Sequence, residues 1–516
     1  MMIIYSFEID INKDGAFSDP VGILSARLIS ASWLLGITDN LRQMSTPLQV
    51  RVSLHDPHLD FSRDVGRNPF GAVLRGKMGR LRATVGEDTY TLFTAWITSV
   101  STDERNGGAI TTLTLEDKML FMQDSEYLPK VSTDILVSDE IQNVFASAFV
   151  GYPYESSFWV MGGSNLGVNT YLYENTHVEL EASQTTLEYA GDAADRGNGV
   201  SALGYIMDLL TAEVGGRFFV DRAGKFQFQS RHHDLIATVS DTFTDAGYVD
   251  FGVAEDTVYN EITVNYFPRQ VGTPGSILFQ SDSVPFSVSG GSSRKISARY
   301  RDPDNEDSTV GAKDVIPLVE NTDIRVNSEE DGSGTDLIRQ VKIMYEIGGT
   351  STQITITNPE GGATAHVTFL QVRGTPLITH ESEQVQNLDV SSLYNYGYSP
   401  MKPIDARFVS KLALAQGFAN QLTKRFSNPQ VVYTSINFLL GRDDAHNRRV
   451  LGRVIGDRIT VKNNISGHDA DYAIVGEQHQ LAGKQHTVRY LLRPANRTKA
   501  WVLGYARLGS ETLLGL

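Results

Sequence analysis

The sequence contains no cysteine among its 516 residues. This absence excludes disulfide bonds, thiolate metal sites and a cysteine nucleophile. The sequence also lacks an apolar run of transmembrane length. Its first residues, Met1-Met-Ile-Ile-Tyr5, have neither the basic flank nor the long apolar region of a signal peptide. We therefore expect a protein that folds in the cytoplasm.

Motifs for common catalytic chemistries are absent as well. There is no phosphate-binding glycine loop that ends in Lys-Ser/Thr, no Gly-x-Ser-x-Gly elbow and no His-Glu-x-x-His. The run His232-His-Asp234 has adjacent side chains that would point to opposite faces of a strand. His479 and His486 flank a predicted hairpin, where we expect exposed side chains. The sequence thus predicts no catalytic, cofactor or metal site.

One segment resembles the start of a calcium loop. Asp10-Ile-Asn-Lys-Asp-Gly15 has the opening spacing of an EF-hand. Counted from Asp10, however, the twelfth position is Val21, where the motif requires a bidentate glutamate. A turn between two strands is the favoured interpretation, and a weak ion site is the alternative.

Charge and composition are those of a folded protein with several domains. The chain is 41% hydrophobic and 21% charged, and its net charge is −16. At this length, roughly three or four domains are expected. A negative balance argues against a surface that grips nucleic acid through its phosphates, because such binding needs clustered Lys and Arg.

Residues 48–115 have the clearest strand pattern. Leu48, Val50, Val52 and Leu54 alternate with polar residues, which is typical of a half-buried strand. Further strand patterns follow, and the last two are joined by a predicted hairpin turn at 106–107. These strands predict a small antiparallel barrel whose edges must find partners.

Helical spacing is found in three later segments. We predict helices over 138–149, 201–214 and 405–426, with Ser138 as an N-cap. A hairpin over 217–229 follows the second helix, so this region is expected to be a small α+β unit. Strand patterns over 431–440, 458–461, 472–475 and 487–492 predict a second barrel.

The predicted fold class is therefore mainly β with α+β insertions. We expect two tube-like β-barrel domains, a small α+β domain and an inserted β-sandwich-like domain. The predicted order is a first barrel (1–125), the α+β domain (126–245), the start of the second barrel block (246–300), the inserted β-rich domain (301–400), the long helix with the second barrel (401–495) and an apolar tail (496–516).

The tail is unusually apolar for a chain end. Leucine and tryptophan recur beside glycine up to the last residue, and such a segment is rarely left in water. We expect it to dock on a neighbouring subunit or on another protein through a set of large apolar residues: Trp501, Leu503, Leu508, Leu513 and Leu514.

Several weak motifs occur in an order typical of one protein family. They include Gly36-Ile-Thr-Asp-Asn40, Tyr90-Thr-Leu-Phe-Thr-Ala-Trp-Ile97, Gly215-Gly-Arg-Phe-Phe-Val-Asp221, Val258-Tyr-Asn-Glu-Ile-Thr-Val264 and Gly456-Asp-Arg-Ile-Thr-Val461. In this order the chain resembles bacteriophage tail hub proteins, also called baseplate hub or tail-tip proteins. The resemblance covers most of the chain and is weakest near 300–370.

The resemblance implies a structural protein of the virion, located at the tail tip and assembled in the host cytoplasm. It implies a homotrimer in which three subunits, each with two tube-like barrels, form a ring of pseudo-sixfold symmetry. The ring would cap and continue the tail tube and pass DNA during genome ejection. Expected partners are the tail tube or distal tail protein, the tape measure protein, and tail fibre or spike proteins through the C-terminal tail, without stable membrane binding.

Two other functions compete with this interpretation. The inserted β domain could hold sugar, which would make the protein a carbohydrate-binding tail-tip adhesin that acts in host recognition. A tail-associated peptidase or glycosidase is the third hypothesis. It is the weakest, because family members that cut the cell wall usually carry an added C-terminal domain.

Overall fold

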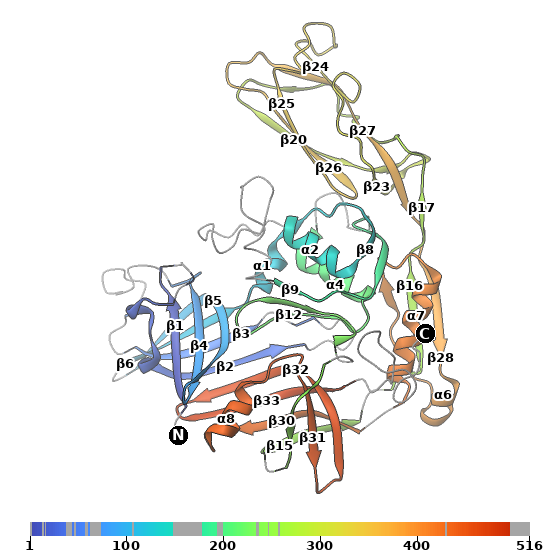
Figure 1. Ribbon diagram of the computed structural model, residues 1–516. Coiled ribbons are helices and arrows are strands. Elements are labelled where there is room, and N and C mark those ends of the chain that lie inside the picture. Colours follow the sequence, from blue (N-terminus) through green and yellow to red (C-terminus); the bar gives the residue numbers. More distant parts are fainter. Residues whose placement is uncertain are drawn as a thin grey trace.

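The computed structural model describes residues 3–495 apart from 13–14, 16, 38–43, 46–47, 57–59, 62–73, 106–107, 148–177, 193–199, 234–236, 246, 256–257 and 429–430. Within these residues the chain is mostly strand with few helices, which confirms the predicted fold class (Figure 1). No helix in these ranges combines the length and the apolar character needed to cross a membrane.

The first β block contains six antiparallel strands in the order β1–β4–β5–β6–β3–β2. The predicted alternation is confirmed in β3, where Val50, Val52 and Leu54 are fully buried while Gln49 and Arg51 are exposed. The strands are β1 (Ile4–Asp10), β2 (Leu28–Gly36), β3 (Gln49–Asp56), β4 (Met78–Val85), β5 (Asp88–Arg105) and β6 (Gly108–Glu116), and two short 3-10 turns (Pro20–Gly22 and Ser25–Arg27) precede β2.

The second β block has the same strand order as the first. Its strands are ordered β14–β31–β32–β33–β30–β15, so that in both blocks the first strand along the chain is followed by the fourth, fifth, sixth, third and second. One pair differs, because β14 runs parallel to β31 whereas β1 runs antiparallel to β4. The elements are β14 (Val239–Phe243), β15 (Asp250–Glu255), β30 (Val431–Leu439), α8 (Asp444–Leu451), β31 (Arg458–Asn463), β32 (His468–Ala482) and β33 (Gln485–Pro494).

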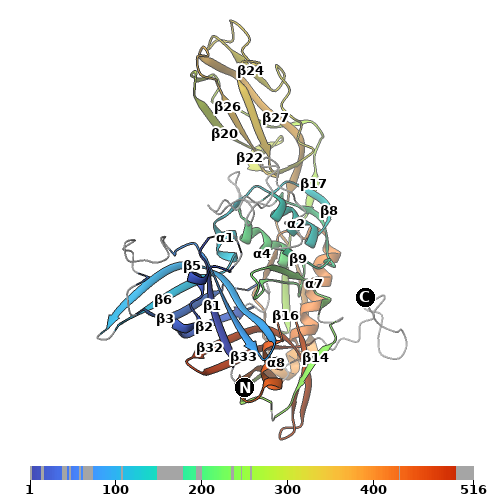
Figure 2. The same cartoon turned by 60° about the vertical axis from the view of Figure 1, so that its left-hand side comes forward.

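The long hairpins of the two blocks also share their register. In the first block Ile97 lies opposite Leu115, and the register shifts by one residue directly after it. In the second block Ile474 lies opposite Leu492, and the same shift follows. β-bulges are conserved features of a fold and not defects, so a bulge at the same place in both hairpins indicates that the two blocks share one fold. We conclude that the two blocks are an internal duplication, visible in Figure 2 as blue and red sheets side by side.

The α+β unit and a small sheet fill the space between the two blocks and the insert, and they share one hydrophobic core. The predicted helices at 138–149 and 201–214 are present as α2 and α4, and the predicted hairpin is β12–β13. The elements of the α+β unit are α1 (Met119–Asp124), β7 (Glu126–Tyr127), β8 (Ser132–Leu136), α2 (Val137–Ser147), β9 (Val178–Leu180), β10 (Thr186–Ala190), β11 (Val200–Ser201), α4 (Ala202–Ala212), β12 (Arg217–Val220) and β13 (Phe226–Gln229).

The third predicted helix is shorter than expected. Helix α7 (Leu412–Phe426) starts seven residues after Asp405, because Ile404–Ala406 forms strand β29 and pairs in parallel with β16. Phe408, which fits the helical spacing, is buried outside the helix. The prediction was wrong at this end because sheet pairing outweighs local helical periodicity. The remaining elements of this sheet are β16 (Glu261–Tyr266), β28 (Glu383–Leu388) and α6 (Val390–Tyr396).

The insert projects away from the blocks and has its own hydrophobic core (Figure 1). Its central strand β27 pairs with five others along its length. The strands are β17 (Arg269–Val271), β18 (Ser276–Gln280), β19 (Phe286–Val288), β20 (Ser293–Arg299), β21 (Arg301–Asp302), β22 (Asn305–Thr309), β23 (Gly311–Lys313), β24 (Ile324–Asn327), β25 (Lys342–Ile347), β26 (Ser351–Thr357) and β27 (Ala365–Thr379).

Candidate assembly interface

The predicted docking residues of the tail, Trp501, Leu503, Leu508, Leu513 and Leu514, lie outside the described residues. So does Asp234 of the histidine pair, whereas His233 bonds to the carboxylate of Glu181. Among the described residues no group of three or more His, Asp or Glu side chains is placed to hold a metal ion. Asp10 accepts a hydrogen bond of 2.8 Å from the backbone N–H of Gly15, as expected for the turn interpretation.

The two β blocks are joined by one strand pair. Strand β2 of the first block pairs antiparallel with the second half of β32, so that Ser30 lies opposite Ala482 and Gly36 opposite Gly476. The first half of β32 pairs on the same edge with β31. The joint therefore uses the part of a long hairpin strand that its own block leaves open. It merges both blocks into one sheet and one hydrophobic core.

Glycine permits the close approach at the end of this joint. Gly36 has a φ of +150°, and a Cβ at this position would lie 2.3 Å from the Cα of Gly476. Such a distance is far below van der Waals contact. The two opposed glycines are thus a steric requirement of the joint.

Aromatic and histidine rings are packed beneath the joint. Trp33 stacks on His479 with a centroid distance of 4.5 Å, and Nδ1 of His479 lies 3.0 Å from Nε2 of His486. The Tyr5 hydroxyl completes the row, 2.9 Å from Nδ1 of His486. His479 and His486 are 0% and 1% exposed, so the expectation of exposed histidines was wrong. Their strands alternate as expected, but the inward face is covered by the other block.

The row of rings ends at a buried ion pair. Nε2 of His479 lies 3.5 Å from a carboxylate oxygen of Glu477, and Glu477 accepts two hydrogen bonds from Arg222. Arg222 belongs to the β12–β13 turn, so the pair ties the α+β unit to the joint. Burial alone would raise the pKa of Glu477, but the Arg222 guanidinium lowers it to about 2. Burial lowers the pKa of both His479 and His486, which keeps the rings neutral.

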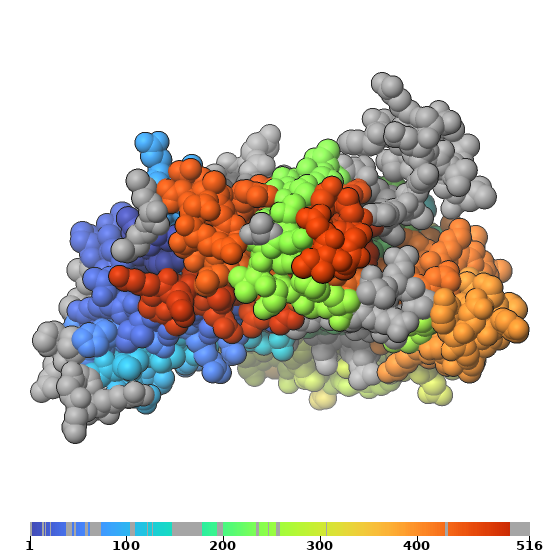
Figure 3. Space-filling model, turned by 90° about the horizontal axis from the view of Figure 1, so that it is seen from below, coloured from blue at the N-terminus to red at the C-terminus, as the bar shows by residue number. Residues whose placement is uncertain are grey.

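Strand β15 is the counterpart of β2, and its outer edge has no strand partner among the described residues. Its inward row, Val249, Phe251 and Val253, is 59%, 40% and 46% exposed, although Phe251 stacks on Tyr433. On the inward row of β2, Ala31, Trp33 and Leu35 are no more than 3% exposed, whereas Ile29 at its start is 36% exposed. Figure 3 shows the green segment that carries β15 at the surface beside the red strands of its block. An exposed apolar edge strand is a typical pairing site.

Strand β5 carries a second open edge. Strand β4 pairs only with Asp88–Trp96 of β5, while β6 pairs with its other edge from Trp96 to Arg105. Residues 98–105 therefore have no described strand partner on the edge that β4 occupies earlier. This half of β5 corresponds to the half of β32 that binds β2. The alternation Val249, Phe251, Val253 was the sequence signal for β15, which our strand prediction missed.

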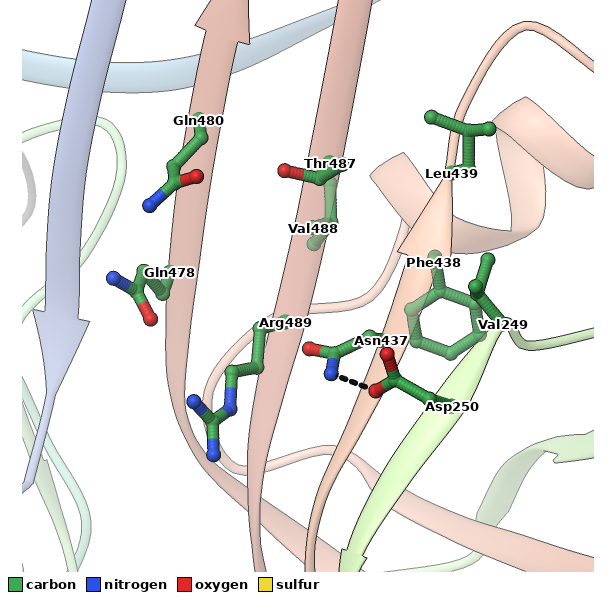
Figure 4. A pocket seen from close by; sticks show the side chains of 10 residues that line it. All are labelled: Val249, Asp250, Asn437, Phe438, Leu439, Gln478, Gln480, Thr487, Val488 and Arg489. Carbon is green, nitrogen blue, oxygen red and sulfur yellow. Dashed lines mark hydrogen bonds between the residues drawn. The ribbon is translucent and has the colours of Figure 1, made fainter.

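The outward face of the joined sheet is polar. Gln478 and Gln480 of β32 and Thr487 and Arg489 of β33 point to the same side (Figure 4). They line a hollow of about 370 Å³ that extends to β15, where Asn437 donates a hydrogen bond to Asp250. The lining combines amide and hydroxyl side chains with apolar ones, and its charged residues are Asp250 and Arg489.

No protein-family model and no curated protein sequence matches this chain. Solved structures do match. A tail protein from Neisseria meningitidis MC58 is 9% identical with a TM-score of 0.45, covering 96% of this chain and 97% of the other. The 43 kDa tail protein of prophage MuSo2 from Shewanella oneidensis is 9% identical with a TM-score of 0.44, covering 95% and 98%.

A third similar structure is the E. coli c3393 protein, with 9% identity, a TM-score of 0.36 and coverage of 91% and 74%. It is described as a component of the type VI secretion system with structural similarity to the T4 bacteriophage tail proteins gp27 and gp5. These neighbours are thus tail proteins and a secretion-system component.

Proposed function

We propose that this protein is the structural hub of a bacteriophage tail tip or baseplate, and that it forms a homotrimeric ring of pseudo-sixfold symmetry. The observation that carries the proposal is the internal duplication of the β block. Three copies of a chain with two equivalent blocks supply six blocks, which is the number needed to continue a sixfold tail tube. The ring would cap the tube and form the conduit for DNA ejection.

The unfinished sheet supports self-assembly. Within the described residues, each copy has two strand edges without a strand partner, one at β15 and one at the second half of β5. An edge with exposed apolar side chains is a liability for a solitary protein, and closing the sheet against other copies removes it. Head-to-tail contacts of this kind generate a ring when the rotation closes.

The polar face of the joined sheet is suited to line the bore. Its outward rows contain Ser30, Ser32, Gln478, Gln480 and Thr487, together with the exposed Leu34, Arg51 and Arg489. DNA binding through the backbone depends on clustered Lys and Arg, so a mainly uncharged wall with few positive charges, in a chain of net charge −16, would let the duplex slide.

Further partners would bind the two ends of the ring. The tail tube or distal tail protein and the tape measure protein would contact one end, and a tail fibre or spike would bind the segment 496–516. If that segment is a docking site, truncation after Pro494 keeps the ring intact but abolishes binding of the next tail-tip component. Unchanged binding by the truncated chain would exclude this role.

The proposal is tested by measuring the mass of the full-length chain with mass photometry and imaging it by electron microscopy. We expect particles near three times 56.8 kDa with a central bore, and rings stacked on the end of tubes when the tail tube protein is added. A chain that stays monomeric at all concentrations and ignores the tube protein would contradict the proposal.

A further inference from the structure

The joint between the two blocks within one chain is a template for a contact between chains. Strand β2 fills the open half of β32, yet its counterpart β15 and the counterpart half of β5 both lack a described partner. We propose that β15 of one copy pairs antiparallel with residues 98–105 of β5 of a second copy. The inference depends on the proposed function in one respect, because it requires copies of the chain to assemble with one another.

Strands β5 and β32, whose second halves receive the added strand, correspond through the hairpins that they form with β6 and β33. Before the turn of the first hairpin Arg105 lies opposite Gly108, and before the turn of the second Ala482 lies opposite Gln485. Both registers then run without interruption to the bulge that the hairpins share. Arg105 is therefore the counterpart of Ala482.

Strands β2 and β15, which supply the added edge strand, correspond through the strands that they pair with inside their own blocks. Ser30 of β2 lies opposite Ser53 of β3, and Asp250 of β15 lies opposite Asn437 of β30. Ser53 and Asn437 in turn lie opposite Thr112 and Arg489, which are four positions after Gly108 and Gln485, the first paired residues of the two return strands. Asp250 is thus the counterpart of Ser30.

The template fixes the register of the proposed contact. Because Ser30 lies opposite Ala482 within the chain, Asp250 of one copy is placed opposite Arg105 of the next.

The apolar row of β15 supplies the second argument. In the filled joint, the inward side chains of β2 are buried against β32 and the shared core, with Trp33 only 3% exposed. In the open block, Phe251 and Val253 remain 40% and 46% exposed. In the proposed register Val253 lies opposite Thr102 of the second β5 and Phe251 lies opposite Glu104, so the added strand covers the edge beside both apolar residues. The hydrophobic effect therefore favours the same contact that the backbone edge requires.

Disulfide trapping tests the register directly, because the chain contains no cysteine of its own. A copy with Asp250→Cys is mixed with a copy with Arg105→Cys under mild oxidation. We expect disulfide-linked dimers in the mixture and in neither variant alone. The double variant should form a ladder that ends at the size of the ring. A disulfide requires Cα atoms about 4.4–6.8 Å apart, so trapping reports register and not mere proximity.

The matched control replaces Arg105→Cys by Ser101→Cys. Ser101 is exposed and lies four residues from Arg105, about 14 Å along β5. It should trap at least tenfold less. Equal trapping at both positions would overturn the register. Dimers of the Asp250→Cys variant alone would show pairing of β15 with β15 and overturn the choice of partner.

A second variant tests how strongly the contact stabilises self-assembly, without a covalent bond. Phe251→Lys places a charge on the edge strand and should weaken self-assembly about tenfold or more. The control Val390→Lys changes a residue that is 68% exposed on another unit and should leave assembly unchanged. Intact rings with no trapping and no effect of Phe251→Lys would overturn this inference and leave the proposed ring standing. A chain that is monomeric throughout would overturn both.

Discussion

The two β blocks of this protein share a strand order and a hairpin register, yet they differ in what covers their outer strand. In the first block β2 pairs with β32, and Trp33 below it is almost completely buried. In the second block β15 is the last described strand of the sheet, and Phe251 is 40% exposed. The same topology thus gives a finished and an unfinished edge. The comparison teaches that burial is decided by the neighbour of a block and not by its own fold.

The largest difference between the two edges is expected from removing an aromatic ring from each. Trp33→Ala leaves a cavity under the joint and should lower the free energy of unfolding by about 3–5 kcal/mol. Phe251→Ala in the monomeric state should cost about 1 kcal/mol, chiefly through its lost stacking on Tyr433. Denaturant unfolding of both variants at low protein concentration measures the contrast. Equal losses would mean that the edges do not differ in burial.

The buried ion pair at the joint offers the next test. Glu477→Leu leaves the Arg222 charge without its partner and should lower the free energy of unfolding by about 3–5 kcal/mol. Glu320→Gln removes an exposed ion pair with Arg339 and should cost less than about 1 kcal/mol. Both are measured by denaturant unfolding at pH 7. A small effect of Glu477→Leu would contradict a joint sealed from water.

The opposed glycines provide a steric test of the joint. Gly36→Ala forces the β2 and β32 backbones apart and should lower the free energy of unfolding by about 1–3 kcal/mol. Gly417→Ala in α7, where no described atom outside its own helix backbone and chain neighbours lies within 4 Å of the added Cβ, should be neutral or stabilising by up to about 1 kcal/mol. Thermal unfolding of the two variants separates them. A neutral Gly36→Ala would refute the close approach.

The smallest expected effect is a dependence of the joint on pH. The pKa of His479 and of His486 is lowered in the folded chain, so below the ordinary histidine pKa the unfolded chain binds protons that the folded chain does not. Their contribution to stability is therefore complete above about pH 6.5. It is lost as the pH falls, by up to about 1.4 kcal/mol per pH unit for each ring. His486→Gln should reduce this slope. An unchanged slope would contradict a neutral buried ring.

Local patterns predicted much of the fold. The alternation of Val50 and Val52 is a property of a strand with one buried face, and it predicted β3 and the mainly β class. The turn Asp221-Arg-Ala-Gly224 forms as expected, with a hydrogen bond from the Gly224 N–H to the Asp221 carbonyl. Such features depend on neighbours in sequence, so they can be inferred without knowing what packs on them.

Contacts between distant segments could not be predicted in the same way. The start of α7 was placed too early because Ile404–Ala406 joins a sheet with residues 264–266. The buried state of His479 depends on Trp33, which is far away in sequence. The hydrophobic periodicity of one segment does not depend on its distant partner, so a local sequence pattern could not predict the contact.

By itself the sequence determined a cysteine-free, mainly β chain with two strand-rich segments, an α+β unit and an order of motifs typical of tail hub proteins. Only the tertiary structure decided that the two segments are copies of one block, that β2 pairs with the second block, and that β15 has no strand partner in the part of the chain that is described. The physical reason is that strand periodicity fixes which face of a strand is apolar, whereas the partner at its edge is chosen by backbone hydrogen bonds that any sequence can make.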